Sequence, residues 1–144
     1  MNQRFEIVSD FTIGLCSSLQ NNMANKMYQT NKVIDCSKDV GFLGSYKDYT
    51  DESNRKRLYQ QELVQFQTYV FATCETIYQS LLRDEPIFVC CKDCTQVSPI
   101  IALVFLIKYG SMSLRDAMRV ILSKVTTRVF QPSIEYFSIV ESIA

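Results

Sequence analysis

The fold is decided by the stretch Pro86-Ile87-Phe88-Val89-Cys90-Cys91-Lys92-Asp93-Cys94-Thr95-Gln96-Val97-Ser98-Pro99, which continues into an apolar run over 100–107. Residues 87–90 form a short unbroken apolar run, typical of a strand covered on both faces. Ser98 fits the cap of a helix, and Pro99 fits its first position, where a missing N–H costs nothing. The stretch therefore predicts a buried strand, a tight loop and a helix start. Unpaired N–H groups and the positive end of the helix dipole would gather there, which favours a bound anion and a cysteine thiolate.

The loop resembles the signature of cysteine-dependent protein phosphatases, especially the small dual-specificity phosphatases. Their pattern is His-Cys, two variable residues, Gly, two variable residues, Arg, and Ser or Thr. Cys91 stands at the nucleophile position and Ser98 at the hydroxyl position, whereas Cys90, Cys94 and Val97 replace the histidine, the glycine and the arginine. The resemblance implies that Cys91 and Ser98 are vestiges of a catalytic pair. It also implies a degenerate phosphate-binding loop of Cys91, Lys92, Asp93, Cys94, Thr95, Gln96, Val97 and Ser98.

Flanking stretches extend the resemblance over nearly the whole chain. Residues 83–89 look like the lead-in strand of the poxviral members, and 109–117 resemble the family's Gly-Met-Ser-x-x-x-Ala helix start. Residues 130–133 stand where the family has Asn-Pro-Asn, and 13–18 look like its Leu-Tyr-Leu-Gly-Ser. The resemblance implies one dual-specificity phosphatase-like domain over 1–144, an α/β fold of three layers. Its central, mostly parallel sheet would have about four to five strands flanked by helices.

The replaced residues weaken phosphate chemistry. An arginine clamps two phosphate oxygens with a charged, bidentate fork, and Val97 offers neither donor nor charge. Cys94 replaces a glycine that allows a tight turn, and a non-glycine residue held left-handed costs roughly 1–2 kcal/mol. Asp93 would repel a phosphate dianion if it faced inward. Asp48 and Asp51 are the candidates for a general acid, but both lie further upstream than the family's spacing, and neither is assigned.

Composition narrows the classes of function. The chain has 144 residues, net charge zero and no histidine, which removes Ser-His-Asp and Cys-His catalysis and His-ligated metals. Zero net charge gives no support to a nucleic-acid or membrane partner, and no apolar run approaches about 20 residues. The first residues lack an apolar signal core, so we expect an intracellular, cytoplasmic protein, in the host cytoplasm if the chain is viral.

Six cysteines in such a chain predict reduced thiols rather than a disulfide framework. Two alternatives stay open for the loop, namely zinc bound by Cys90, Cys91 and Cys94, and redox pairing of Cys91 with Cys94. The remaining three cysteines are expected to be small buried side chains, and they are Cys16, Cys36 and Cys74. No cofactor and no metal is predicted.

Hydrophobic periodicity predicts the other elements. Strands or a hairpin are expected over 5–8 and 11–15, a helix over 19–28, a buried strand over 32–36 and a short strand near 42–46. A polar loop over 48–54 should precede a helix over 56–82, whose buried face is Leu63, Phe66, Val70, Cys74, Ile77 and Leu81, widened by Val64, Phe71 and Tyr78. A central buried helix from Pro99 should end at Gly110, and two more helices should begin after Ser113 and Ser133.

The leading interpretation is a catalytically inactive dual-specificity phosphatase homologue that acts by binding proteins. The partners it implies are phosphoproteins, or the substrates and regulators of active phosphatases. A second interpretation is a weakly active phosphatase with altered loop chemistry, in which a positive residue such as Lys92 replaces the arginine or Cys91 and Cys94 carry out thiol chemistry. A third is a structural viral module that forms a homodimer.

Overall fold

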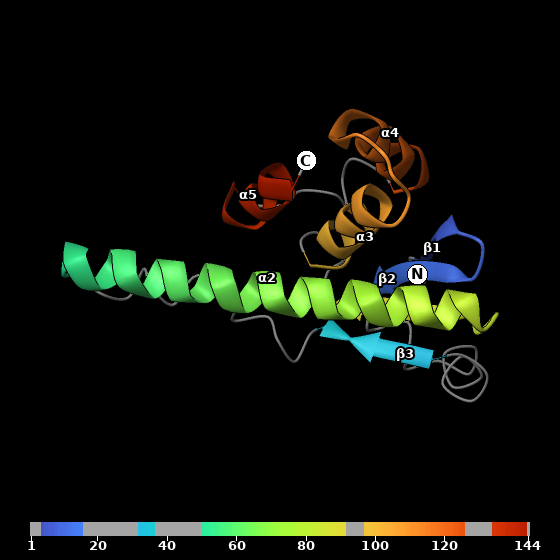
Figure 1. Cartoon of the computed structure of the whole chain (residues 1–144), viewed down its shortest axis with the longest axis horizontal. Coiled ribbons are helices and arrows are strands. Elements are labelled where there is room, and N and C mark those ends of the chain that lie inside the picture. The colour runs from blue at the N-terminus through green and yellow to red at the C-terminus, as the bar shows by residue number, and fades with distance from the viewer. Residues whose placement is uncertain (1–3, 16–31, 37–49, 92–96, 126–133, 144) are drawn as a thin grey trace.

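The computed structural model describes residues 4–15, 32–36, 50–91, 97–125 and 134–143 (Figure 1). Several expected features lie outside these residues, among them the helix over 19–28, the strand near 42–46 and the helix start at Ser133. In the part of the chain that is described, no helix is both long and apolar enough to cross a membrane.

A four-stranded sheet forms the centre of the molecule, in the order β1-β2-β4-β3. The strands are β1 (Arg4–Val8), β2 (Phe11–Leu15), β3 (Lys32–Asp35) and β4 (Ile87–Cys91). β1 and β2 form the expected antiparallel hairpin, and Asp10 takes φ 70° in its turn, a conformation that aspartate tolerates. β4 is parallel to both of its neighbours, β2 and β3. The prediction of a mostly parallel sheet is therefore confirmed.

Position in the sheet explains which strands are buried. All five residues of β4 are buried, as the unbroken apolar run predicts for a strand between two neighbours. The prediction that the strand over 32–36 is buried is wrong for β3, whose residues are exposed or half-buried. Among the described strands, β3 lies at the edge of the sheet and pairs with β4 alone. Cys36, just past its end, is fully buried.

Four described helices accompany the sheet, and they are α2 (Glu52–Leu82), α3 (Val97–Lys108), α4 (Leu114–Lys124) and α5 (Ile134–Ile143). α3 is the central helix, as its uniformly apolar sequence predicts, because residues 97–106 are all buried. It contacts α2, α4, α5, β2 and β4. Figure 1 shows it between α2 and α4. This packing fixes the start of α3 against the end of β4.

α2 begins at Glu52 rather than at Lys56, so the predicted loop over 48–54 is wrong from residue 52 onward. Asp51 caps the helix, because its carboxylate accepts a hydrogen bond from the Ser53 N–H at 3.1 Å. The predicted buried stripe is confirmed where α2 faces the core, but Val64 is 61 % exposed and does not widen it. The first turns of α2 extend past the strands (Figure 1), and Glu62 is the first buried residue of the helix.

The turn between α3 and α4 differs in one detail from the prediction that Gly110 ends the helix. The left-handed residue is Ser111, with φ 54°, rather than Gly110. Gly110 is needed for another reason, since a Cβ there would lie 2.5 Å from the carbonyl oxygen of Leu106. Ser113 then caps α4 as predicted, and its hydroxyl accepts a hydrogen bond from the Asp116 N–H at 3.1 Å.

Candidate functional site

Cys91 and Ser98 come together at the carboxyl end of β4. Cys91 is the last residue of that strand, and Ser98 lies in the first turn of α3. Their Sγ and Oγ atoms are 3.1 Å apart, within hydrogen-bonding distance for sulfur, and either atom can be the donor. Cys91 is 2 % exposed and Ser98 is fully buried. The pair that the sequence pattern singles out is therefore a buried contact.

The start of α3 lies earlier than the sequence predicts. α3 begins at Val97, so Ser98 is inside the first turn instead of capping it, and Pro99 is not the first helical residue. A proline is compatible with any position of the first turn, because those N–H groups have no partner within the helix. The hydroxyl of Ser98 contacts the sulfur of Cys91.

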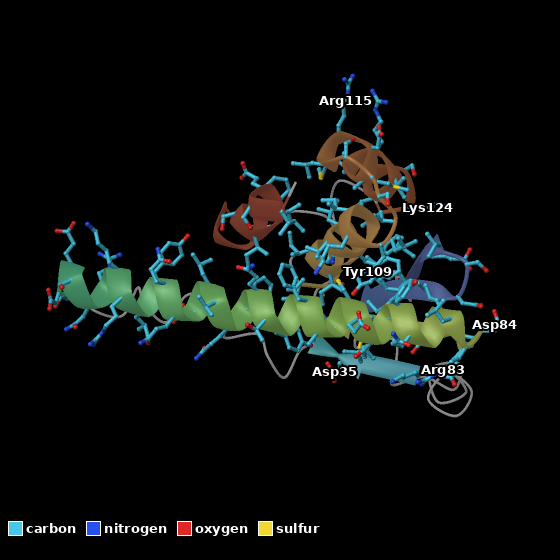
Figure 2. The ribbon with its side chains drawn as sticks, viewed as in Figure 1. Asp35, Arg83, Asp84, Tyr109, Arg115 and Lys124 are labelled. Atoms are coloured by element: carbon cyan, nitrogen blue, oxygen red, sulfur yellow. The ribbon has the colours of Figure 1, made fainter. Side chains whose placement is uncertain are left out.

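Val97, at the arginine position of the resembled pattern, belongs to the hydrophobic core. It is 5 % exposed and packs in the same apolar cluster as Ile100, Ile101 and Cys91. Every lysine or arginine whose side chain is described is exposed. Figure 2 shows one of them, Arg115, on α4 and pointing away from the rest of the molecule. Within the described residues, no buried cation stands in for the missing arginine.

Five loop residues of the predicted site lie outside the described residues, and they are Lys92, Asp93, Cys94, Thr95 and Gln96. The two alternatives that involve Cys94 therefore stay predictions. Over the described ranges, no group of three or more His, Cys, Asp or Glu side chains is placed to hold a metal ion. Asp51, one of the two acid candidates, is exposed and caps α2, and Asp48 is not described.

A second thiol, Cys36, belongs to the same apolar cluster as Cys91, and the sequence predicts it only as a small buried side chain. In the parallel pair of β3 and β4, Asp35 is the partner of Cys90, and Cys36 is the first residue after the end of β3. Cys36 is fully buried, and the Tyr69 hydroxyl of α2 donates a hydrogen bond to its sulfur at 3.1 Å. Cys36 is the last residue of the strand predicted over 32–36, but the pairing of that strand with β4 is not visible in the sequence.

An aromatic cluster joins α2 to the end of α3, where Figure 2 labels Tyr109. The Tyr109 ring stacks on Tyr78 at 4.6 Å and on Phe105 at 5.4 Å between centroids. Its hydroxyl donates a hydrogen bond to the carboxylate of Glu75. That hydrogen bond raises the pKa of Tyr109 to about 12 and lowers the pKa of Glu75, to which Gln79 also donates. The cluster fixes α3 against α2.

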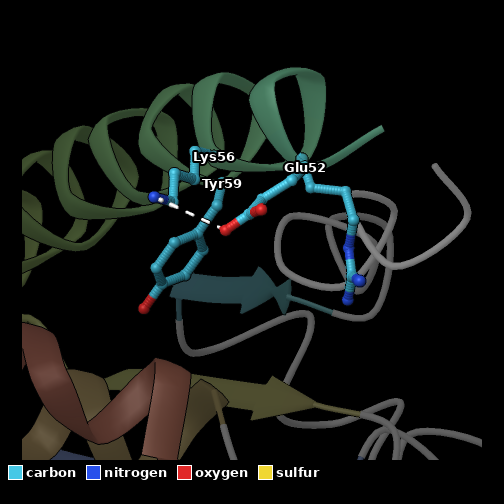
Figure 3. A pocket seen from close by; sticks show the side chains of 4 residues that line it. Glu52, Lys56 and Tyr59 are labelled. Carbon is cyan, nitrogen blue, oxygen red and sulfur yellow. Dashed lines mark ion pairs between the residues drawn. The ribbon is translucent and has the colours of Figure 1, made fainter. Parts of the chain in front are cut away.

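A hollow of about 270 Å³ lies beside the first two turns of α2 (Figure 3). Its described lining is Glu52, Arg55, Lys56 and Tyr59, and Lys56 pairs with Glu52 at 3.7 Å. Both members of the ion pair are largely exposed, so it contributes little to stability. Neither Cys91 nor Ser98 is among the described residues that line this hollow.

Comparison with known proteins finds the same fold without a sequence relative. No protein family model matches the chain, and no curated protein matches it. Human tyrosine phosphatase-like serine/threonine/tyrosine-interacting protein superimposes with TM-score 0.67 at 12 % identity, over 96 % of this chain and 93 % of that one. Human DUSP28 gives TM-score 0.64 at 11 % identity, over 97 % and 91 %.

A leucine rich repeat and phosphatase domain containing protein from Entamoeba histolytica gives TM-score 0.65 at 10 % identity, over 98 % of this chain and 90 % of that one. These neighbours share the mixed sheet and the helices that flank it, at identities that establish the fold alone. The chain has the α/β fold of the dual-specificity and tyrosine phosphatases.

Proposed function

We propose that this protein is a catalytically inactive member of the dual-specificity phosphatase group that acts by binding other proteins. The observation that carries the proposal is Val97. Where an active enzyme of the resembled pattern places a cationic clamp, this chain places an aliphatic side chain that packs into the core. The side chain therefore offers a phosphoryl group no charge and no hydrogen-bond donor.

The size of this loss favours inactivity over weak activity. Each charge-assisted hydrogen bond that an arginine would donate is worth about 1.5–3 kcal/mol. One preorganised donor aimed at the transition state is typically worth about 10²–10³ in rate. The cysteines at the histidine and glycine positions lower the expected activity further. Cys90 supplies no imidazole, and Cys94 lacks the freedom of glycine to adopt a positive φ angle.

One further observation supports a binding role. A human protein with the same fold is named as tyrosine phosphatase-like and as a serine/threonine/tyrosine-interacting protein. The partner class we infer is a phosphoprotein, or a protein that an active phosphatase also contacts.

The test is incubation of the purified chain with p-nitrophenyl phosphate and with phosphotyrosine, phosphoserine and phosphothreonine peptides. We expect no nitrophenolate release above the level of the Cys91→Ser variant, and we expect peptides recovered from the incubation to keep their phosphate by mass spectrometry. Binding is measured separately on the immobilised chain. We compare the retention of each phosphopeptide with the retention of the same peptide without phosphate.

Turnover that disappears in Cys91→Ser would contradict the proposal and would favour a phosphatase with altered loop chemistry. Ser142→Ala is a suitable control, because the Ser142 hydroxyl bonds to a carbonyl within α5, away from β4. This variant should match the wild type in nitrophenolate release, in peptide dephosphorylation and in peptide retention.

A further inference from the structure

We propose that the solvent face of α2 binds a second copy of this chain, with the two copies of the helix antiparallel. The proposal does not depend on whether the protein binds phosphoproteins. It rests on an exposed stripe of α2 with coiled-coil spacing, on side chains in the middle of that stripe that can be removed from water, and on opposite charges placed symmetrically at its ends.

The solvent face of α2 has the residue spacing of a coiled-coil seam. The side of the helix that faces the core holds the fully buried residues Phe66, Val70, Cys74 and Ile77. On the opposite side, residues recur at alternating intervals of four and three, and we call them the outer stripe: Arg57, Gln61, Val64, Thr68, Phe71 and Glu75. Five of these six are exposed, and Phe71 is half-buried. Such spacing keeps one stripe directed at a partner helix along its length.

The middle of the outer stripe can lose its contact with water without leaving a polar group unpaired. The Val64 side chain is 61 % exposed, so its burial against a partner is favourable. The Thr68 hydroxyl already donates a hydrogen bond to the Val64 carbonyl oxygen at 2.8 Å. The ring of Phe71 already lies under the ammonium of Lys108, 4.2 Å from the ring centroid. A second helix can therefore cover this region at little cost.

The charges near the two ends of the outer stripe favour an antiparallel pair. Arg57 and Glu75 lie at equal distances along the chain from residue 66. In a parallel pair each residue would face its own copy, so that arginine would face arginine and glutamate would face glutamate. In an antiparallel pair with its twofold axis at residue 66, Arg57 of each copy faces Glu75 of the other. Val64 then faces Thr68, and the two halves of the contact are identical.

Neighbouring antiparallel registers leave these charges unmatched. A shift of the axis by half a heptad toward the end of α2 places Glu75 opposite Val64 and Arg57 opposite Leu82. A shift in the other direction places Arg57 opposite Thr68 and places Glu75 beyond Glu52, the first residue of the partner helix. Facing charges of opposite sign set orientation and register more than affinity. The charge pattern therefore selects the register that is centred on residue 66.

Both charged side chains are already held in place on the helix surface. Arg57 donates a hydrogen bond to the Asn54 side chain at 3.2 Å. The carboxylate of Glu75 accepts hydrogen bonds from Tyr109 and from Gln79, and these hydrogen bonds lower its pKa. Glu75 is therefore ionised at neutral pH. Side chains that are held in this way lose less freedom when a partner binds.

The length of the outer stripe fits a reversible dimer. From Arg57 to Glu75 the helix spans about 27 Å, at about 1.5 Å per residue. One helix pair of this length gives a contact at the small end of specific interfaces, below about 1,200 Å² in total. We therefore expect a dimer that forms at high protein concentration and dissociates on dilution.

The experiment is analytical ultracentrifugation of the full chain from micromolar to millimolar concentration. We expect the wild type to shift from monomer to dimer as the concentration rises. Arg57→Glu and Glu75→Arg each place like charges opposite one another, so each should raise the dissociation constant by at least about tenfold. An equimolar mixture of the two variants should dimerise as the wild type does, because each chain then meets the opposite charge at both ends of the stripe.

Arg115→Glu is the matched control, since it makes the same change of charge at an exposed site on α4, and it should dimerise as the wild type does. Circular dichroism shows which variants are folded. If Glu75→Arg is unfolded because it loses the hydrogen bond to Tyr109, Val64→Asp takes its place as a second variant of the outer stripe, and it should also raise the dissociation constant.

A wild type that stays monomeric at millimolar concentration would overturn the proposal, whatever the variants do. So would a dimer whose dissociation constant is unchanged in Arg57→Glu, or folded charge variants whose mixture does not dimerise. A dimer that is lost in Arg115→Glu would place the contact on α4 and would also overturn it.

Discussion

At the scale of single residues, Val97 is a core side chain, and the absence of a phosphate clamp at this position follows from that placement. Replacing it by arginine buries a charged group among apolar neighbours, since the site is 5 % exposed. We expect Val97→Arg to lower the free energy of unfolding by at least about 2 kcal/mol in a urea titration. Val64→Arg is the matched control on α2, where the valine is 61 % exposed, and it should change stability by less than about 0.5 kcal/mol.

Equal stabilities of the two arginine variants would contradict this placement. They would mean that residue 97 faces solvent or the loop, where a cation is tolerated. The argument for a lost phosphate clamp would then rest on the identity of the residue alone.

Tyr109 gives a second residue-scale prediction, in the alkaline range. Its hydrogen bond to Glu75 raises the pKa of Tyr109 from 10.0 to about 12 in the folded protein. A raised pKa contributes stability that is complete below pH 10 and is lost as the pH rises to about 12. In Glu75→Ala we expect the pKa of Tyr109 to fall toward 10, measured by NMR of ring-labelled tyrosine. Glu141→Ala, an exposed change on α5, should leave it unaltered.

A Tyr109 that titrates near pH 10 in the wild type would contradict the contact. A pKa that stays high in Glu75→Ala would assign the shift to burial or to the stacked ring of Tyr78 instead.

At the scale of elements, the turn between α3 and α4 contains two small residues with different roles. Gly110 is small because space is lacking there, whereas Ser111 has the left-handed backbone conformation. A Cβ at Gly110 would lie 2.5 Å from the Leu106 carbonyl oxygen, which is backbone and has little room to move. We expect Gly110→Ala to cost about 1–3 kcal/mol of stability in a urea titration. Ser111, with φ 54°, is the residue under conformational strain, and Ser111→Gly should be neutral or stabilising by up to about 1 kcal/mol.

The opposite order, with Ser111→Gly destabilising and Gly110→Ala neutral, would place the stop of α3 at Gly110, as its sequence suggests. The slope of the free energy of unfolding against urea concentration is measured for both variants. A slope that differs from the wild type would show that the mutation changes the unfolded state as well as the folded one.

At the scale of the whole molecule, the sequence predicts the fold well where burial follows from composition. β4 is apolar throughout and α3 is apolar over 99–107, and a strand or helix with no polar face is buried on all sides in the centre of a domain. Burial of β3 was overestimated because it depends on having two neighbouring strands, which residues 32–36 do not reveal. The start of α2 was missed because Asp51 and Ser53 look like loop residues until the cap they form is seen.

The sequence predicts those parts of the site that depend on neighbouring residues and not those that depend on packing between distant elements. The contact of Cys91 with Ser98 follows from a local pattern of eight residues, 91–98. The neighbourhood of Cys36 is set by pairing between strands that are far apart in the chain, which no local pattern contains. The burial of Val97 depends on how α3 packs, so the sequence predicts the loss of a charge but not where the valine points.

The most direct test of the central claim is a calorimetric titration of the wild-type chain with orthovanadate, an analogue of the phosphoryl group in transfer. We expect no heat of binding at millimolar vanadate, and no difference between the wild type and Cys91→Ser. Saturable binding in the micromolar range that is lost in Cys91→Ser would contradict the proposed inactivity, because the pocket would then hold the oxyanion without an arginine at position 97.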